Sequence, residues 1–230
     1  MKFRRFTAVL FTFLFVASMT GCTLKKKKKD EKSPDETKQV EENKVTERAV
    51  GTANYTTEFI DLYDGISVVQ VSGLPGAVQD KINNAIKSED QSRIDKAAES
   101  EAGPEYTLSC EVKYSDISLL SIVKKNQLVS GYSEQYMTFD TSTGDTLSLS
   151  QVTDINSAAE KILKCEGITV VSGTEIEKLT KYINNRISRA DEIVSKLSEN
   201  DFYIDSDGSI VMQITLDGKA MIKVDGVHVG

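Results

Sequence analysis

The sequence predicts an α+β fold in which an antiparallel sheet has helices packed on one face. Several segments alternate apolar and polar residues, which is the two-residue period of a half-buried strand, and short turns separate them. Other segments place apolar residues three or four positions apart, the spacing of an amphipathic helix. Consecutive strands joined by short turns favour antiparallel pairing. The predicted order of elements is β-α-β-β-β-β-α-α-β-β.

The first predicted strand covers residues 66–71 (ISVVQV), and Ser72-Gly73 ends it. A helix follows at Pro75, because proline is accepted in the first turn of a helix. Helical spacing continues more weakly to Ala98, before the Gly103-Pro104 break.

A run of strands comes next. Residues 106–114 alternate as a half-buried strand, and residues 117–123 form a second, more apolar strand. Residues 124–127 (KKNQ) are predicted to turn the chain, and residues 128–139 to return it as a hairpin. Residues 147–149 are predicted to add a short strand.

The last part of the chain is predicted to contain two helices and the closing strands. The helices cover residues 156–164 and 174–199, and the second is the clearest element because its apolar residues recur without interruption. Thr174 and Glu177 have the spacing of a capping box at its start. The closing strands are predicted at residues 202–204, 210–216 and 221–224.

Two polar stretches have the composition of functional sites. Residues 138–152 (TFDTSTGDTLSLSQV) combine hydroxyls, carboxylates and a glycine, but Thr143-Gly144-Asp145 is also what a chain reversal requires. Residues 205–208 (DSDG) have half the pattern of a calcium loop, yet position twelve of such a loop falls on Leu216 instead of glutamate. In both stretches we expect a hairpin turn, and no metal site is predicted.

The amino terminus has the pattern of a secretory signal. Residues 1–6 are basic, residues 7–16 are apolar or nearly so, and small residues then lead directly to Cys22. This arrangement resembles the bacterial lipobox, and it implies a signal peptide over residues 1–21 with lipid attached to Cys22. An ordinary signal peptide with an incidental cysteine is the alternative. Lipidation places the mature protein on the extracytoplasmic face of the cell membrane.

A charged tether is predicted between the lipid and the folded domain. Five consecutive lysines, Lys25, Lys26, Lys27, Lys28 and Lys29, follow the proposed anchor and suit contact with an anionic membrane surface. The rest of the segment 22–53 is almost free of apolar residues, so it cannot repay the entropy of folding. We therefore expect a disordered tether over residues 22–53 and a single α+β domain over residues 54–230.

The charge of the folded part excludes nucleic acid as a partner. The whole chain carries a net charge of −7, and residues 49–230 contain 16 basic against 28 acidic residues, a balance of −12. Phosphate backbones need clustered Lys and Arg, so this domain is repelled by DNA and RNA.

The sequence contains no recognisable catalytic constellation. The one histidine, His228, lies near the carboxyl end, and no serine has an identifiable base or a Gly-x-Ser-x-Gly elbow. No phosphate-binding glycine loop and no cofactor motif is present. Cys110 and Cys165 are predicted to face the core. An extracytoplasmic location permits a disulfide between them, and two buried thiols are the alternative.

Three segments in order resemble a known family. They are ISVVQVSGLPGAVQDKINNAI, YMTFDTSTGDTLSLSQV and DFYIDSDGSIVMQI. Their turns and core strands resemble the extracytoplasmic domain shared by RsiV-type anti-sigma factors and PdaC-type peptidoglycan deacetylases. The sequence departs from that family at residues 129–133, where a glycine-rich stretch often carries a histidine and this chain has none. It also lacks the sigma-binding segment, the membrane helix and the catalytic domain of those proteins.

The resemblance implies the extracytoplasmic module alone, and in the RsiV-type case it implies recognition of lysozyme. The expected function is thus a lipid-anchored, non-enzymatic binding or sensing module at the cell envelope, with a lysozyme-like hydrolase or peptidoglycan as partner. The acidic domain favours a basic protein partner. The alternatives are an accessory lipoprotein with no ligand of its own and an unrecognised envelope hydrolase.

Overall fold

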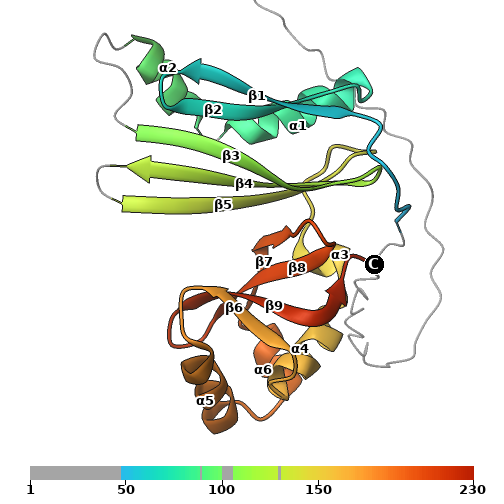
Figure 1. The fold of residues 1–230 in the computed structure, drawn as a ribbon, viewed down its shortest axis with the longest axis vertical. Coiled ribbons are helices and arrows are strands. Elements are labelled where there is room, and N and C mark those ends of the chain that lie inside the picture. Colours follow the sequence, from blue (N-terminus) through green and yellow to red (C-terminus); the bar gives the residue numbers. More distant parts are fainter. Residues whose placement is uncertain (1–47, 89, 100–105, 129–130) are drawn as a thin grey trace, which may run out of the picture. The chain divides into compact units, whose positions relative to one another are not determined.

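The computed structural model describes residues 48–88, 90–99, 106–128 and 131–230 (Figure 1). Across these ranges nine strands and six helices form two sheets, which confirms the predicted α+β class. Both sheets belong to one compact unit. The predicted signal peptide, Cys22 and Lys25–Lys29 lie outside the described residues, so the lipid anchor stays a prediction.

The first sheet has five strands in the order of the chain. They are β1 (Thr56–Tyr63), β2 (Ile66–Ser72), β3 (Tyr106–Ser115), β4 (Leu119–Leu128) and β5 (Gly131–Asp140). All neighbours are antiparallel except β2 and β3, which are parallel and pair only through Ile66 and Leu108. Parallel neighbours need a crossover connection. Here α1 (Gly76–Ser88) and α2 (Gln91–Glu99) supply it.

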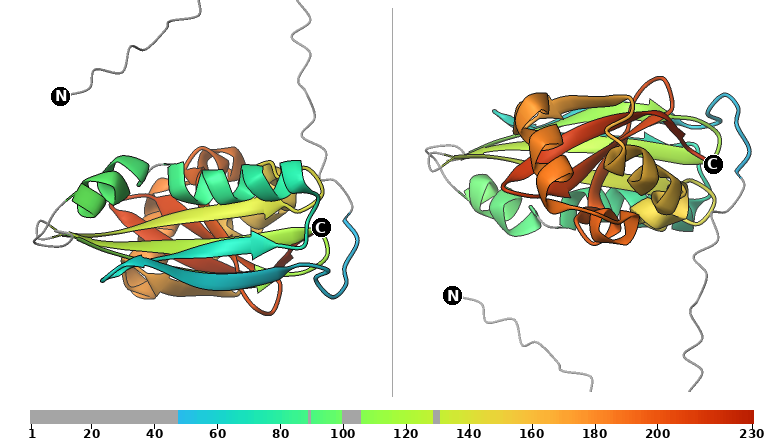
Figure 2. Two further views of the ribbon diagram at one scale, coloured as in Figure 1. Left: turned by 90° about the horizontal axis from the view of Figure 1, so that it is seen from above. Right: turned by 90° about the horizontal axis from the view of Figure 1, so that it is seen from below.

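Both crossover helices cover one face of this sheet, as Figure 2 shows. Ile82 and Ile86 of α1 are fully buried there. They belong to one hydrophobic cluster with the sheet residues Val68, Leu108, Leu120, Ile122 and Phe139. The apolar residues that recur at helical spacing after Pro75 thus pack against the even-numbered residues of β4.

Farther along β2, where it no longer pairs with β3, the side chain of Asn83 from α1 takes the place of a strand partner. Its side-chain oxygen accepts a hydrogen bond from the Val71 N–H at 2.8 Å, and its amide nitrogen donates to the Val71 carbonyl at 2.9 Å. Both polar groups of a buried strand residue are therefore satisfied by one side chain.

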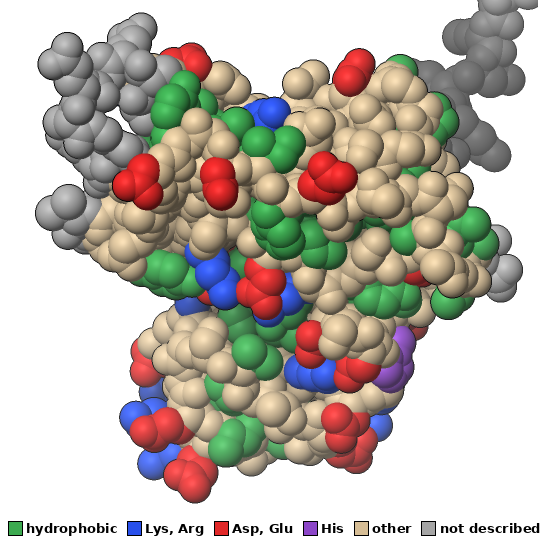
Figure 3. Space-filling model, turned by 45° about the horizontal axis from the view of Figure 1, so that its top comes forward, with side chains coloured by type: hydrophobic (Ala, Val, Ile, Leu, Met, Phe, Trp, Pro, Cys, Tyr) green, Lys and Arg blue, Asp and Glu red, His purple; other side chains and the backbone are tan. Residues whose placement is uncertain are grey.

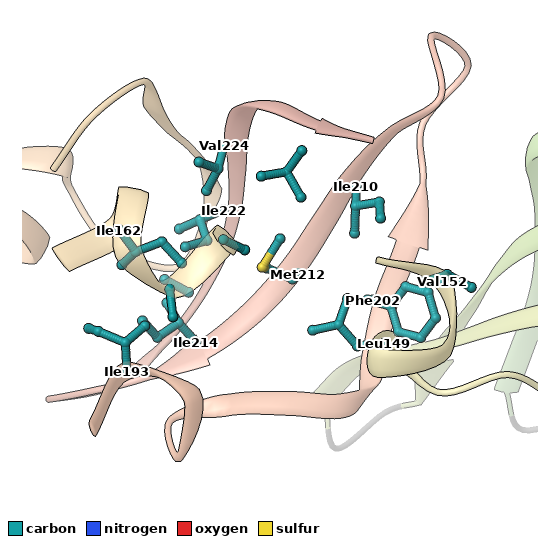
Figure 4. Packing of buried hydrophobic residues seen from close by; sticks show 14 of the residues in the cluster. Leu149, Val152, Ile162, Ile193, Phe202, Ile210, Met212, Ile214, Ile222 and Val224 are labelled. Carbon is teal, nitrogen blue, oxygen red and sulfur yellow. The ribbon is translucent and has the colours of Figure 1, made fainter. Parts of the chain in front are cut away.

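The second sheet has four antiparallel strands in the order β6-β9-β8-β7. Its strands are β6 (Ile168–Ser172), β7 (Leu197–Ile204), β8 (Ser209–Thr215) and β9 (Lys219–His228). Its helices are α3 (Leu149–Val152), α4 (Ile155–Leu163), α5 (Ile176–Arg186) and α6 (Ala190–Val194). Figure 4 shows the shared core, in which Ile162 and Ile193 from two helices meet Ile214 and Ile222 from two strands.

Strand β7 joins the two sheets. It lies against the first sheet on the face opposite α1 and α2, where the Ile204 N–H donates to the Ser121 hydroxyl at 3.1 Å. Ser121 also exchanges a hydrogen bond with Thr138 of β5 at 3.0 Å, and all three residues are buried. The odd-numbered face of β4 is therefore half covered by β7, and its other half remains open.

The predicted turn at residues 124–127 is wrong, because these residues continue β4. Lys124, the first of them, is fully buried and forms an ion pair with Asp90 at 2.6 Å. Four polar residues in a row are typical of a turn. Here two of them, Lys124 and Asn126, are buried on the helix-covered face. Because β4 runs on to Leu128, the reversal into β5 comes after this stretch.

The predicted helix over residues 174–199 is divided. Helix α5 ends at Arg186, and Ile187 has the extended conformation φ −121°, ψ 132°. A five-residue helix α6 follows, and Leu197 already belongs to β7. The apolar spacing persists because α5, α6 and β7 all pack on the same cluster. The capping box predicted from Thr174 does not form, because Glu175 is the residue that precedes α5 and its side chain makes no cap hydrogen bond.

Three other segments differ from the prediction. Residues 147–149 form no strand: Thr146 makes one isolated bridge with Phe139, and α3 begins at Leu149. Strands β1 and β6 were not predicted. The helix predicted at residues 156–164 is confirmed as α4, and the Asp154 side chain caps it by accepting from the Asn156 and Ser157 N–H groups.

Candidate functional site: a tyrosine face on the first sheet

The open part of the first sheet carries a connected group of polar and aromatic side chains. We call it the tyrosine face, and it consists of Glu111, Lys113, Lys125, Tyr132, Glu134, Tyr136 and Tyr203. Strand register brings these residues together: Lys125 is opposite Glu134 and Val123 is opposite Tyr136. Glu111 is opposite Val123, hence diagonal to Lys125. On the surface seen in Figure 3, basic, acidic and hydrophobic side chains adjoin one another in the middle, and acidic side chains prevail above them.

Two lysines hold the Glu111 carboxylate. Lys113 lies 2.6 Å from one oxygen and Lys125 lies 2.8 Å from the other. An irregularity in the pairing of β3 and β4 falls at Lys113, between Val112 and Tyr114. Hydrogen bonds from the two lysines lower the pKa of Glu111. At neutral pH the Glu111 carboxylate is ionised, and its negative charge is balanced by the two lysines.

Glu134 is held differently, by two tyrosine hydroxyls. Tyr132 donates to one oxygen at 2.6 Å and Tyr136 donates to the other at 2.7 Å. Burial is the main cause that raises the pKa of both tyrosines, and the hydrogen bonds to Glu134 add to it. The pKa of Tyr132 is raised to about 12, and that of Tyr136 is raised further. Both hydroxyls are therefore neutral donors at physiological pH. Within the described part of the chain, Glu134 has no ion pair.

A pair of aromatic rings extends the face onto β7. The rings of Tyr136 and Tyr203 are stacked, with centroids 5.8 Å apart and planes inclined by 17°. The Lys113 ammonium lies 5.5 Å from the centroid of the Tyr203 ring, within the range of a cation–π contact. The face thus offers aromatic rings beside two carboxylates: Glu111, which forms ion pairs with both lysines, and Glu134, which two tyrosine hydroxyls orient and which Lys125 attracts without forming an ion pair.

Residues 205–208 border this face and form the turn between β7 and β8. The Gly208 N–H donates to the Asp205 carbonyl at 2.8 Å, and Gly208 has φ +78°. Lys223 contacts the carboxylate of Asp207 at 2.8 Å and that of Asp205 at 3.4 Å. Lys223 and Ser209 lower the pKa of Asp207. The search of the described residues found no group of three or more acidic, histidine or cysteine side chains arranged to hold a metal.

Residues 140–145 also form a turn and are docked on α1. The Gly144 N–H donates to the Asp140 carbonyl at 2.8 Å, and the Asp140 carboxylate accepts from the Ser142 N–H at 2.8 Å. Asp145 forms an ion pair with Lys81 of α1. The hydroxyls and carboxylates of this stretch are therefore engaged in the turn and its attachment.

The two cysteines of the folded part are free thiols. Cys110 packs beside the cluster of the first sheet and Cys165 beside that of the second. Burial raises the pKa of both thiols. His228 is exposed at the end of β9. The structure therefore brings neither cysteine nor the histidine into the tyrosine face.

The tyrosine face was not found from the sequence. Its one local signal is the spacing of Tyr132, Glu134 and Tyr136, which alternate along a single strand and so project from the same side. The contribution of Tyr203 depends on the packing of β7 across the first sheet.

Comparison with known proteins leaves the family open. No protein-family model matches this chain, and no curated protein matches it. Among the residues that the structure describes, no helix is both long and apolar enough to cross a membrane.

Proposed function

We propose that this protein is a lipid-anchored, non-enzymatic binding module of the bacterial cell envelope, and that its tyrosine face binds a basic protein. A lysozyme-like hydrolase is the partner that the family resemblance implies. The anchor is the lipid on Cys22, and the segment 22–53 tethers the domain to the extracytoplasmic face of the membrane.

The observation that carries this proposal is the environment of Glu134. Its carboxylate is exposed, oriented by two tyrosine hydroxyls, and has no ion-pair partner in the described structure. A lysine or arginine of a partner can pair with this carboxylate while its stem lies on the stacked rings of Tyr136 and Tyr203. Tyrosine and arginine are the residues most enriched at the energetic centres of protein interfaces.

The charge of the domain supports the same class of partner. Residues 49–230 carry a net charge of −12. A strongly basic partner is attracted over a distance of about one Debye length, which accelerates association and makes it dependent on salt.

The proposal is tested by titrating the full chain, purified in a non-ionic detergent, with a basic lysozyme in a calorimeter. We expect saturable binding that weakens as salt is added. Glu134→Gln keeps the size of the side chain but removes its charge, and it is expected to weaken binding by about tenfold or more, the loss of one charge-assisted contact. Glu160→Gln is the matched control, since Glu160 is exposed on α4 and outside the face.

Two outcomes contradict the proposal. One is binding that Glu134→Gln and Glu160→Gln leave equally unchanged. The other is no binding to lysozyme. In the second case, binding of soluble muropeptides that is lost in Tyr136→Ala identifies wall material as the ligand, and no binding to either favours an accessory lipoprotein.

A further inference from the structure

A second site of different charge lies on the other sheet, between α5 and the β8–β9 turn. It is a cavity of about 430 Å³, within the size range of small-ligand pockets. Four basic side chains line it, Lys178, Lys181 and Arg186 from α5 and Lys219 from β9, against the single carboxylate of Asp217. This concentration of positive charge stands out in a domain whose net charge is −12.

Three of these cations have no ion-pair partner among the residues that the structure describes. Lys178 pairs with Glu175 at 3.0 Å, but Lys181, Arg186 and Lys219 take part in no ion pair or side-chain hydrogen bond in the described part of the chain. Like charges gathered around one hollow repel one another, and an anion bound between them removes that repulsion. A group with more than one negative charge is favoured, because it can contact cations from both elements at once.

The two sides of the cavity are fixed by a close backbone approach. Gly173 has φ +97°, and a Cβ atom at this position would lie 2.2 Å from the Lys219 carbonyl oxygen. Only glycine permits the loop before α5 to lie so near the start of β9. The backbone that carries Lys219 is thereby held beside the one that leads into α5.

The remaining lining residues indicate what the anion is attached to. Leu179 and Ala220 are buried beneath the cavity, and the Tyr182 ring borders it. Thr174 and Asn185 add a hydroxyl and an amide. Apolar and aromatic surface beside hydroxyl and amide groups suits the carbon–hydrogen and hydroxyl groups of a sugar or polyol.

We propose that this cavity binds a phosphate-bearing sugar or polyol, with Lys181, Arg186 and Lys219 contacting the phosphate. The inference is independent of the tyrosine face, which shares no residue with the cavity. The same glycerol phosphate chemistry occurs in a soluble molecule and in the headgroup of an anionic lipid.

The test measures binding of glycerol 3-phosphate to the full chain in detergent by nuclear magnetic resonance titration. We expect saturable shifts with glycerol 3-phosphate, weaker ones with inorganic phosphate and none with glycerol. Lys219→Glu and Lys181→Glu are expected to weaken binding at least about tenfold each. Lys196→Glu makes the same charge change at an exposed lysine outside the cavity, and its affinity should stay within about twofold of the original protein.

A second titration, with a short-chain phosphatidylglycerol that dissolves in the same detergent, distinguishes the two sources of the phosphate. The lipid on Cys22 and Lys25–Lys29 are the same in both variants, so any difference between Lys219→Glu and Lys196→Glu in the resonance shifts comes from the cavity. Loss of phosphatidylglycerol binding only in Lys219→Glu supports the site with a lipid headgroup as ligand, and loss confined to glycerol 3-phosphate supports a soluble one. The inference is overturned if neither probe binds, or if Lys219→Glu and Lys196→Glu behave alike with both. These results leave lysozyme binding at the tyrosine face unaffected, so the two proposals fail separately.

Discussion

At the scale of single residues, the most consequential contact is the ion pair of Lys124 with Asp90. The Lys124 side chain is 0% exposed and that of Asp90 is 2% exposed, and their charged atoms are 2.6 Å apart. Removing two charges from water is costly, and their attraction offsets that cost only while both partners remain. The pair attaches the segment between α1 and α2 to β4, so the helical cover of the first sheet depends on it.

We expect Asp90→Asn to destabilise the protein strongly. The substitution removes the counter-charge of a fully buried ammonium, and breaking a buried pair in this way costs about 3–5 kcal/mol. Urea denaturation followed by circular dichroism measures the change. The double variant Asp90→Asn with Lys124→Met removes both charges at similar volume and should regain much of the loss. A cost below about 1 kcal/mol for Asp90→Asn contradicts a structural role for the pair.

At the scale of elements, local signals predicted what depends on neighbouring residues and missed what depends on distant ones. Helix α4 was predicted almost to its ends, because its apolar spacing and its polar flanks are local. The break between α5 and α6 was not predicted. Ile187 and Leu197 pack on the same cluster as α5, so the apolar spacing continues past the end of the helix although the backbone there is no longer helical. The tyrosine face shows the same limit, since Tyr136 and Tyr203 meet only after β7 packs against β5.

The turn at residues 140–145 allows a test of its structural role. Gly144 has φ +74°, and a Cβ atom there would lie 3.0 Å from the Val78 carbonyl oxygen of α1. Gly144→Val therefore combines backbone strain with a clash, and we expect a loss of about 1–3 kcal/mol that thermal unfolding detects. Gly76→Ala is the control, because an added Cβ meets nothing within 4 Å. Unchanged stability together with lost ligand binding in Gly144→Val would instead indicate a functional site.

At the scale of the whole molecule, charge is divided along the chain. Five consecutive lysines, Lys25–Lys29, follow Cys22 after two intervening residues, whereas residues 49–230 carry a net charge of −12. An anionic membrane surface attracts the lysine run and repels the acidic domain. Under the proposed lipid anchor, the tether predicted over residues 22–53 would let both preferences be satisfied, and the proposed basic partner would meet the acidic domain away from the lipid surface. This division could be predicted from composition alone, whereas the cation-lined cavity inside the acidic domain required the fold, since Lys181 and Lys219 belong to different elements.

The proposed location of the protein at the cell envelope depends on the lipid anchor at Cys22. In bacteria fed an alkyne-tagged fatty acid, the full chain should incorporate the tag and sediment with membranes. Cys22→Ser removes the only thiol of the lipobox-like segment, so it should abolish labelling and leave the precursor uncleaved. Cys110→Ser, at a partly buried thiol of the folded domain, should keep both the label and the membrane location. If Cys22→Ser still carries the label, the lipid is attached elsewhere. If neither the original protein nor Cys110→Ser is labelled, residues 1–21 act as an ordinary signal peptide and Cys22 is incidental.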